Sequence, residues 1–512
     1  MTAAAMILTS FAPFTALDYR LGGPIIVLTL FALGILCFDL MLPASQKQYS
    51  ALPALLGLGV AAYATRGIQV LLPESGEPLR GFFGTIVIDP FSIYFFYLFL
   101  VGAAVAVLIS IKYLEIEREN HGEFYALILF AVTGMMCMAA GYDLVLLFIG
   151  LELMALSTYI LVGFLRSNQR SNEAALKYLL LGAFSSAILA YGLSLFYGLS
   201  GSTNLGDIAH ALSIRVAANP RDPIVILALL TTMTGLLFKI AAAPFHMWAP
   251  DVYEGAPTSV TGFMSVAVLA ASWALMLRML LFGLYPLRAL YVPLLVFTAI
   301  LTLTAGNLAA ITQTNTKRLL AYSSIAHVGY MLLGLVASDG LANRTGIKGI
   351  LFYLLAYTFM NLGAFAVLTS LRRRKIVGDD IEDISGLVQK APVEAVLMLV
   401  FLLSLAGVPP FAGFYGKYFV FLSLIETGHY VIATIAVLYA VVAAYYYLRI
   451  ANAMFMGKAD TEEPVPSTGA MNLALGVTAA ATVIIGLFPN IFIQAVNWSV
   501  SSLSPGGIAL LK

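Results

Sequence analysis

Long apolar runs, separated by short polar segments, follow one another along almost the whole chain. A bilayer offers no hydrogen bonds to the backbone, so each run is expected to be a helix of about 20 residues crossing roughly 30 Å of hydrocarbon. We count fourteen runs, at residues 23–42, 51–72, 89–111, 123–140, 142–165, 174–198, 224–247, 257–283, 289–312, 318–338, 346–371, 396–424, 430–455 and 470–495. The pattern predicts an all-α, polytopic membrane protein with about fourteen transmembrane helices and no soluble domain.

The composition supports this class. Of the 512 residues, 61% are hydrophobic and 10% are charged, which excludes an ordinary soluble protein. The 27 basic and 26 acidic residues give a net charge of +1, which argues against a nucleic-acid partner. Cys37 and Cys137 lie inside apolar runs, so we expect neither a disulfide framework nor a CxxC metal site. The sequence therefore predicts no cofactor in this chain.

The basic residues of the loops predict the orientation. Cytoplasmic loops of membrane proteins carry an excess of Lys and Arg. Eight basic residues lie on the side of the two termini and thirteen on the opposite side, including the run Arg372, Arg373, Arg374 and Lys375. Both termini are therefore expected on the outer side. The first seventeen residues lack a basic segment and are expected to form an interfacial lead rather than a cleaved signal.

Two of the predicted spans contain both a lysine and helix-breaking residues. In the seventh span Lys239 precedes Pro244, and in the twelfth span Lys417 follows Pro409 and Pro410. Proline removes a backbone donor and clashes with the preceding turn, so both helices should be interrupted. Broken helices at membrane depth are tolerated where they line a cavity, and this environment would favour a functional Lys239 over a buried structural pair.

The order of lysine and proline predicts an inverted repeat. Spans seven and twelve are five spans apart, so they cross the membrane in opposite directions and reverse the order of the two residues. Paired, interrupted segments of this kind mark the working site of transporters built from inverted repeats. We predict N-terminal helices 1–3 in residues 1–122, a first repeat of helices 4–8 in 123–283, a second of helices 9–13 in 289–455, and helix 14 with a tail in 470–512. A chance resemblance between the two segments is the alternative.

Other charged residues also fall inside the predicted spans. Glu152 lies near the middle of span five, where it is either a neutral acid bonded to a backbone carbonyl or an ionisable group that responds to a nearby charge. Lys177 is a candidate for that charge, although Glu173, four residues earlier, would also explain it as a surface pair. Arg66, Arg278 and Arg449 lie closer to span ends and are expected to reach the headgroups.

Span ten carries a histidine among hydroxyl groups. Ser323 and Ser324 precede His327 by four and three residues, so the three side chains share one helix face. A histidine at this depth is either a satisfied structural residue or, because it titrates near neutral pH, a proton relay. His246 is nearer to a span end and is the weaker candidate.

Several segments together resemble the antiporter-like subunit N family of proton-pumping NADH:quinone oxidoreductase, respiratory complex I. The resemblance runs from Asp89-Pro90-Phe91 to about Phe455. The segments that carry it most specifically are Leu151-Glu152-Leu153-Met154, Arg170-Ser171-Asn172-Glu173-Ala174-Ala175-Leu176-Lys177-Tyr178, Phe238-Lys239, Pro244-Phe245-His246, Trp248 through Pro257, Lys317 through Ser324, and Gly413-Phe414-Tyr415-Gly416-Lys417.

The resemblance implies a proton-translocating subunit that performs no redox chemistry itself. Glu152 and Lys177 would be the coupling acid and its modulating lysine, Lys239 the central proton-holding lysine, His327 a relay, and Lys417 the terminal lysine. The implied partners are the other membrane-arm subunits, including neighbouring antiporter-like ones. NADH, flavin, Fe-S clusters and quinone would belong to partner subunits, and the location would be the bacterial inner membrane.

The chain departs from the family pattern at one position. The family has a lysine in span eight, where this chain reads Ser265 through Ser272 without one. The link between the two lysines would then rest on His327, Tyr322, Ser272 and water, with Ser323, Ser324 and His246 as further relay candidates. Two alternatives stay open: a subunit of a multisubunit cation/proton antiporter, and a structural membrane scaffold whose ion path has decayed.

Overall fold

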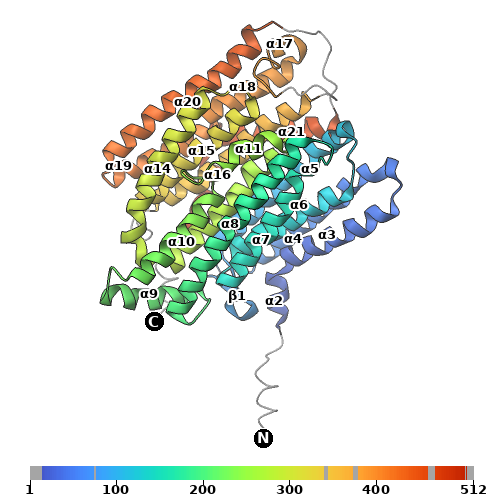
Figure 1. Cartoon of the computed structure of the whole chain (residues 1–512). Helices are drawn as coiled ribbons and strands as arrows, with labels where there is room; N and C mark the ends of the chain where they lie inside the picture. Colours follow the sequence, from blue (N-terminus) through green and yellow to red (C-terminus); the bar gives the residue numbers. More distant parts are fainter. Residues whose placement is uncertain are drawn as a thin grey trace.

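The protein is a bundle of tilted, nearly parallel helices, with α3 and α4 at one edge and α14 and α20 at the other (Figure 1). The computed structural model describes residues 14–73, 77–338, 344–372, 379–458, 468–501 and 503. Its helices and strands are α2 (Ala16–Leu21), α3 (Gly23–Met41), α4 (Ala51–Gln69), β1 (Leu79–Gly81), β2 (Ile86–Ile88), α5 (Pro90–Glu117), α6 (Gly122–Ala140), α7 (Leu144–Val162), α8 (Gln169–Ser200), α9 (Leu205–Ala218), α10 (Pro223–Lys239), α11 (Trp248–Gly255), α12 (Thr258–Phe263), α13 (Leu269–Arg278), α14 (Arg288–Ile311), α15 (Thr316–Ala337), α16 (Thr345–Ser370), α17 (Leu387–Lys390), α18 (Pro392–Ala406), α19 (Ala412–Glu426), α20 (Tyr430–Met456), α21 (Gly469–Leu487) and α22 (Pro489–Ser501).

The helices confirm a multi-span membrane protein. Within the described ranges, twelve helices are long and apolar enough to cross a bilayer, and two shorter apolar helices, α10 and α18, accompany them. These two shorter helices occupy the positions of predicted spans seven and twelve, so the structure has a helix break in each. The count of fourteen spans, the inverted repeat and the boundaries of the four segments stay predictions.

Several elements differ from the pattern read along the chain. Helix α9 and the β1–β2 hairpin occupy connections in which no element was predicted. Span eight is not one regular helix, because π-helical turns at Met264–Val268 and Met279–Gly283 flank α13. The last span ends at Leu487, and Pro489 begins the separate helix α22. Short or amphipathic elements escape a search for long apolar runs.

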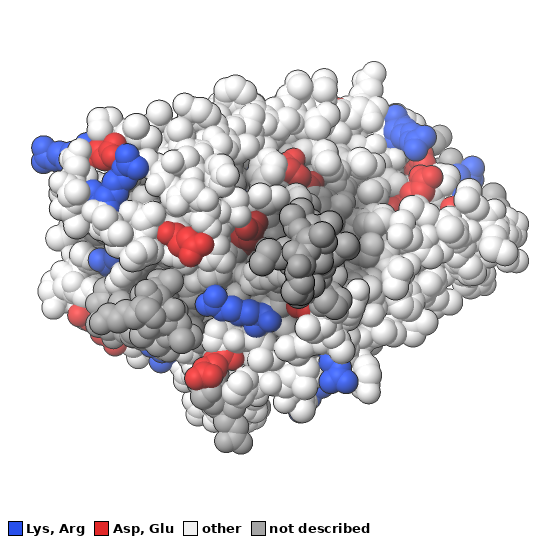
Figure 2. Space-filling view, turned by 90° about the horizontal axis from the view of Figure 1, so that it is seen from below, with Lys and Arg blue, Asp and Glu red and all other residues white. Residues whose placement is uncertain are grey.

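The most buried spans are Thr258–Gly283, α15 and α16, and they form the centre of the bundle. Helices α3 and α20 are the least buried, as expected for helices at its edges. On the face that lies at the bottom of Figure 1, basic and acidic side chains occur in small groups among uncharged residues (Figure 2). Four of the basic residues counted for the orientation prediction lie outside the described residues: Arg373, Arg374, Lys375 and Lys512.

Arg278 does not reach the headgroups, so that prediction is wrong. Its side chain is 0% exposed, and Nη1 and Nη2 donate to the two carboxylate oxygens of Asp89 at 2.8 and 2.7 Å. Its Nε donates to the carbonyl of Ala139 at 2.9 Å. Asp89 lies at the start of α5, far away in sequence, and supplies the partner that makes burial of the guanidinium tolerable.

Arg449 is also held inside the protein. Its guanidinium donates to the carbonyl of Ile311 at 2.7 Å and to that of Gln313, at the end of α14. The last carbonyls of a helix have no partner within it, so a cation there satisfies them. Arg66, in the last turn of α4, is exposed, and its contact with the headgroups stays a prediction.

Candidate functional site

The first helix break begins directly after Lys239, the last residue of α10. Residues 240–247 are not helical, and Ala241 has a left-handed φ of 55°. The break is held from two sides: the amide of Ala243 donates to Thr302 Oγ1 of α14 at 2.9 Å, and Trp248 Nε1 donates to the carbonyl of Phe238 at 3.0 Å. Proline in the predicted position and these tertiary bonds together stop α10 inside the bundle.

Lys239 is only 8% exposed. Among the described residues we find no hydrogen bond or ion pair of its ammonium, and Glu152 of α7 is the acid that acts on it electrostatically. Oε1 of Glu152 is buried and also has no hydrogen-bond partner within the described ranges. Glu152 is therefore not tied to a backbone carbonyl through that oxygen, and within the described residues no hydrogen bond or ion pair joins it to Lys239.

Lys177 pairs with one of the two acids considered from sequence and with a further acid on α11. Its ammonium lies 2.8 Å from Glu173 Oε1, which is the expected pair along the helix, and 2.9 Å from Asp251 Oδ2 of α11. The structure does not bring it into contact with Glu152. Lys177 lines a cavity of about 250 Å³ bounded by α8, α11 and the first turn of α15, and its side chain is 43% exposed.

The second break separates α18 from α19, and Lys417 reaches back across it. The Lys417 ammonium donates to the carbonyls of Leu405 and Ala406 at 3.1 and 2.7 Å. These carbonyls belong to the last turn of α18, where partial negative charge accumulates. Lys417 is 4% exposed, and its ammonium lies 5.2 Å from the ring centroid of Tyr330. The helix break thus supplies the solvation that the lipid would deny a buried cation.

His327 lies at the centre of a hydroxyl cluster. Its Nδ1 is 2.5 Å from the hydroxyl of Tyr353 and its Nε2 is 2.9 Å from the hydroxyl of Tyr447. The Tyr447 hydroxyl also bonds Ser323 Oγ. A similar bond of 2.6 Å joins Ser324 Oγ to the hydroxyl of Tyr357, so both predicted serines are hydrogen-bonded in the same region.

The remaining relay candidates lie outside this cluster. Ser272 Oγ donates to the carbonyl of Val268 in its own helix at 2.9 Å. Tyr322 is half-buried on α15, one turn beyond Arg318. His246 lies in the first break, and its Nδ1 is buried without a hydrogen-bond partner among the described residues. Where the family lysine is missing, Asn361 Nδ2 instead donates to Ser265 Oγ at 2.8 Å.

Four further polar residues of the candidate site were not predicted from sequence: Tyr353, Tyr357, Asn361 and Tyr447. The first three lie four residues apart on α16 and so share one face of an otherwise apolar helix. This polar stripe was the available signal, because a regular series of polar groups on a buried helix needs partners. Tyr447 carries no comparable pattern, and only the packing of α20 against the rest of the bundle places it beside His327.

The structure is a bundle of membrane helices in which two lysines are buried at helix breaks. Ionisable groups in such positions are typical of ion and proton transporters, so the fold and the site define this class of membrane protein.

The family described as NADH:quinone oxidoreductase/Mrp antiporter, TM, matches residues 141–443. NADH-quinone oxidoreductase subunit N 1 of Koribacter versatilis is 64% identical over 94% of this chain and 96% of that protein. Subunit N 2 of Solibacter usitatus is 53% identical over 93% and 96%.

Solved structures agree with these relatives. A chain of respiratory complex I from Thermus thermophilus with bound Aureothin is 34% identical, covers 92% of this chain and 99% of its own length, and has a TM-score of 0.76. A chain of the Mrp complex from Dietzia sp. DQ12-45-1b, 20% identical with a TM-score of 0.81 over 96% and 98%, shows the shared fold alone. The chain belongs to the family of NADH-quinone oxidoreductase subunit N, the antiporter-like membrane-arm subunit of complex I, which confirms the resemblance.

Proposed function

We propose that this chain carries protons across the membrane while partner subunits transfer electrons from NADH to quinone. The names of its relatives and the complex I neighbour support assembly with other membrane-arm subunits. The redox groups would be held by partners. Among the described residues there is no group of three or more His, Cys, Asp or Glu side chains that could hold a metal ion. The proposed location is the bacterial inner membrane, with both termini outside.

The observation that carries this proposal is the burial of Lys239 and Lys417 at the two helix breaks. A charged group at the bilayer centre costs roughly 2.5 to 3.5 kcal/mol on insertion scales, so two such lysines without a carboxylate bonded to either would be expensive as structural devices. A lysine of this kind is suited to gain and lose a proton when a neighbouring charge changes.

In the proposed sequence, a charge change in a neighbouring subunit alters Glu152 and Lys177, and this change shifts the proton affinity of Lys239. The proton then moves along buried water and the hydroxyl cluster of α15 and α16 towards Lys417. Lys417 acts electrostatically on His327, so the two groups oppose simultaneous protonation. Repulsion between like charges would drive proton release, because a proton bound at one site lowers the affinity of the other site for a second proton.

Replacing Lys239 with Met tests the proposal, since Met removes the charge with little change in volume. We expect assembled complex at normal levels and a fall in protons pumped per electron in membrane vesicles. Lys112→Met is the matched control: Lys112 lies near the end of α5 and pairs with Glu115 at 3.1 Å on the surface, so its removal should leave pumping unaltered. An unchanged proton-to-electron ratio in Lys239→Met would refute the assignment.

Co-purification separates this proposal from a subunit of a cation/proton antiporter, which shares the fold without redox coupling. The chain should be recovered with NADH-oxidising subunits. Recovery with antiporter subunits alone would favour the other function.

A further inference from the structure

The short helix α11 lies between the two parts of the site. It packs against α8, which carries Lys177, and against α15, which carries His327. Its first residue, Trp248, bonds the carbonyl of the residue before Lys239. Its last residue, Gly255, is pressed against α8, where a Cβ atom would come within 2.6 Å of the Arg170 carbonyl oxygen. Helix α11 is therefore fixed against α8, α15 and the end of α10.

One carboxylate of α11 joins α8 to α15. Asp251 Oδ2 lies 2.9 Å from the ammonium of Lys177, and Oδ1 accepts a hydrogen bond of 2.7 Å from Arg318 Nη1. Among the charged side chains around this pocket, Asp251 therefore contacts both α8 and α15. Glu173 pairs with Lys177, and Glu254 accepts from Arg318 Nη1 at 2.9 Å.

We propose that Asp251 is a positioning residue that couples the charge of Lys177 to helix α15, and through it to His327. This inference rests on the proton-transfer function proposed above. The two carboxylate oxygens of Asp251 move together, so a change in the attraction of Lys177 for one oxygen alters the hydrogen bond that the other accepts from Arg318. Lys177 then acts on the proton path through Asp251, which it contacts, rather than through Glu152, which it does not.

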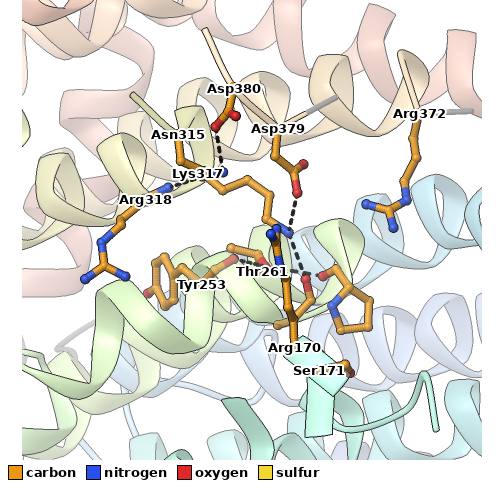
Figure 3. Close-up of polar contacts among 12 residues, drawn as sticks. Arg170, Ser171, Tyr253, Thr261, Asn315, Lys317, Arg318, Arg372, Asp379 and Asp380 are labelled. Carbon is orange, nitrogen blue, oxygen red and sulfur yellow. Dashed lines mark hydrogen bonds and ion pairs between the residues drawn. The ribbon is translucent and has the colours of Figure 1, made fainter. Parts of the chain in front are cut away.

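Arg318 is well placed to pass on such a change. It lies in the first turn of α15, and His327 follows nine residues later, about 13 Å along the helix. The same turn is held by Lys317, whose ammonium donates to the Ala256 carbonyl at 3.0 Å and lies 3.6 Å from Asp379 (Figure 3). A small displacement at this end changes the short bonds between His327 and the two tyrosines, because a packed helix moves as a unit.

The effect of Asp251 depends on every charged group that faces it. These groups are Lys177, Glu173 and Arg170 of α8, Glu254 of α11, and Arg318 of α15. Lys317, Asp379 and Tyr322 surround the same turn of α15. Since several of these groups ionise, the test compares variants at one pH and then repeats the comparison across a pH series.

A double-mutant cycle in vesicles that contain the assembled complex tests the link. The effect of Lys177→Met is measured in the parent protein and in three variants: Asp251→Asn, Glu173→Gln and Glu254→Gln. The measured quantity is the number of protons taken up per quinone reduced. In the parent and the two glutamine backgrounds we expect Lys177→Met to lower pumping at least fivefold, within the range of about 5- to 150-fold that is typical of coupled sites. In Asp251→Asn it should lower pumping less than twofold further.

Each outcome decides the proposal. Equal factors for Lys177→Met in Asp251→Asn and in Glu254→Gln would overturn it. Asp251→Glu, which keeps the carboxylate, should retain the coupling and the pH profile of the parent, and a profile like that of Asp251→Asn would also count against it. If Asp251→Asn does not assemble, Arg318→Gln cuts the same link from the other side and gives the same cycle.

Failure of this inference is distinguishable from failure of the proposed function. Normal pumping in Lys239→Met would refute the function itself. Lost pumping in Lys239→Met, together with equal Lys177→Met factors in all backgrounds, would refute only the role of Asp251.

Discussion

His327 is buried between two tyrosine hydroxyl groups, an arrangement that suits the proton-relay role proposed for it. A neutral imidazole has one donor and one acceptor nitrogen, whereas a tyrosine hydroxyl can both donate and accept. Tyr353 lies at one nitrogen and Tyr447 at the other. In the proposed path, reversal of the hydrogen bonds along Ser323, Tyr447, His327 and Tyr353 would pass a proton without large movement. The histidine was predicted from sequence, but its partners were not.

Two tyrosines of α20 allow this arrangement to be tested. Tyr447→Phe removes the hydroxyl that contacts Nε2 of His327, and we expect the rate of proton pumping to fall about fivefold, the effect of one hydrogen bond of ~1 kcal/mol on a rate. Tyr439→Phe, in the same helix, is the matched control, because its hydroxyl lies 2.8 Å from Thr304 Oγ1 rather than at His327. Equal pumping by the two variants would remove Tyr447 from the path.

Helix ends and helix breaks position several of the charged groups of this protein, although Glu152 lies in the interior of α7. Lys239 closes α10, Lys417 caps the carbonyls of α18, and Asp251 belongs to the half-helix α11. The same holds for the structural ion pair: Asp89 caps α5 through the amide of Ser92 at 2.8 Å while it binds Arg278. Free backbone groups exist only at helix ends, so polar side chains inside the bilayer collect there.

The Asp89–Arg278 pair predicts a stability effect. Arg278→Met leaves a buried carboxylate without its partner, which should cost about 3 to 5 kcal/mol and lower both the inactivation temperature and the amount of assembled complex. Combining it with Asp89→Asn should recover a large part of the loss, because the uncompensated charge is removed. Arg449→Met serves as the control and should cost less, since it frees carbonyl oxygens rather than a carboxylate. A double variant as unstable as Arg278→Met would contradict this explanation.

At the scale of the whole molecule, charged loops gather at the two ends of the bundle. Helix α9 lies at the same end of the bundle as α2, and α17 lies at the opposite end (Figure 1). The uneven distribution of basic residues predicts that the end with α9 faces outward. Orientation decides the direction in which the proposed path carries protons, so it needs a direct measurement.

Cysteine labelling provides it. In a background with Cys37 and Cys137 replaced by alanine, a membrane-impermeant maleimide added to intact cells should label Ser213→Cys, which is exposed on α9. Glu382→Cys, exposed near α17, is the matched position at the other end and should be labelled only after the membrane is opened. The reverse pattern would show that the orientation prediction is wrong.

The sequence by itself determined the membrane class, the positions of most long helices, the two helix breaks and the lysines beside them. Each of these features depends on residues close together in the chain: the length of an apolar run, or a proline within a few residues of a lysine. Even there the local signal had limits, since α9, α11 and α22 are too short or too amphipathic to stand out.

Only the tertiary structure decided which groups meet. Lys177 and Asp251 are 74 residues apart, and Asp89 and Arg278 are 189 apart, so no local pattern could pair them. Of the two partners considered for Lys177, the structure has the pair with Glu173 and shows no contact with Glu152. The expectation that Arg278 reaches the headgroups was wrong, because a buried charge finds its partner through packing between helices distant in the chain. Composition dictates that such charges need partners, and the arrangement of the helices selects them.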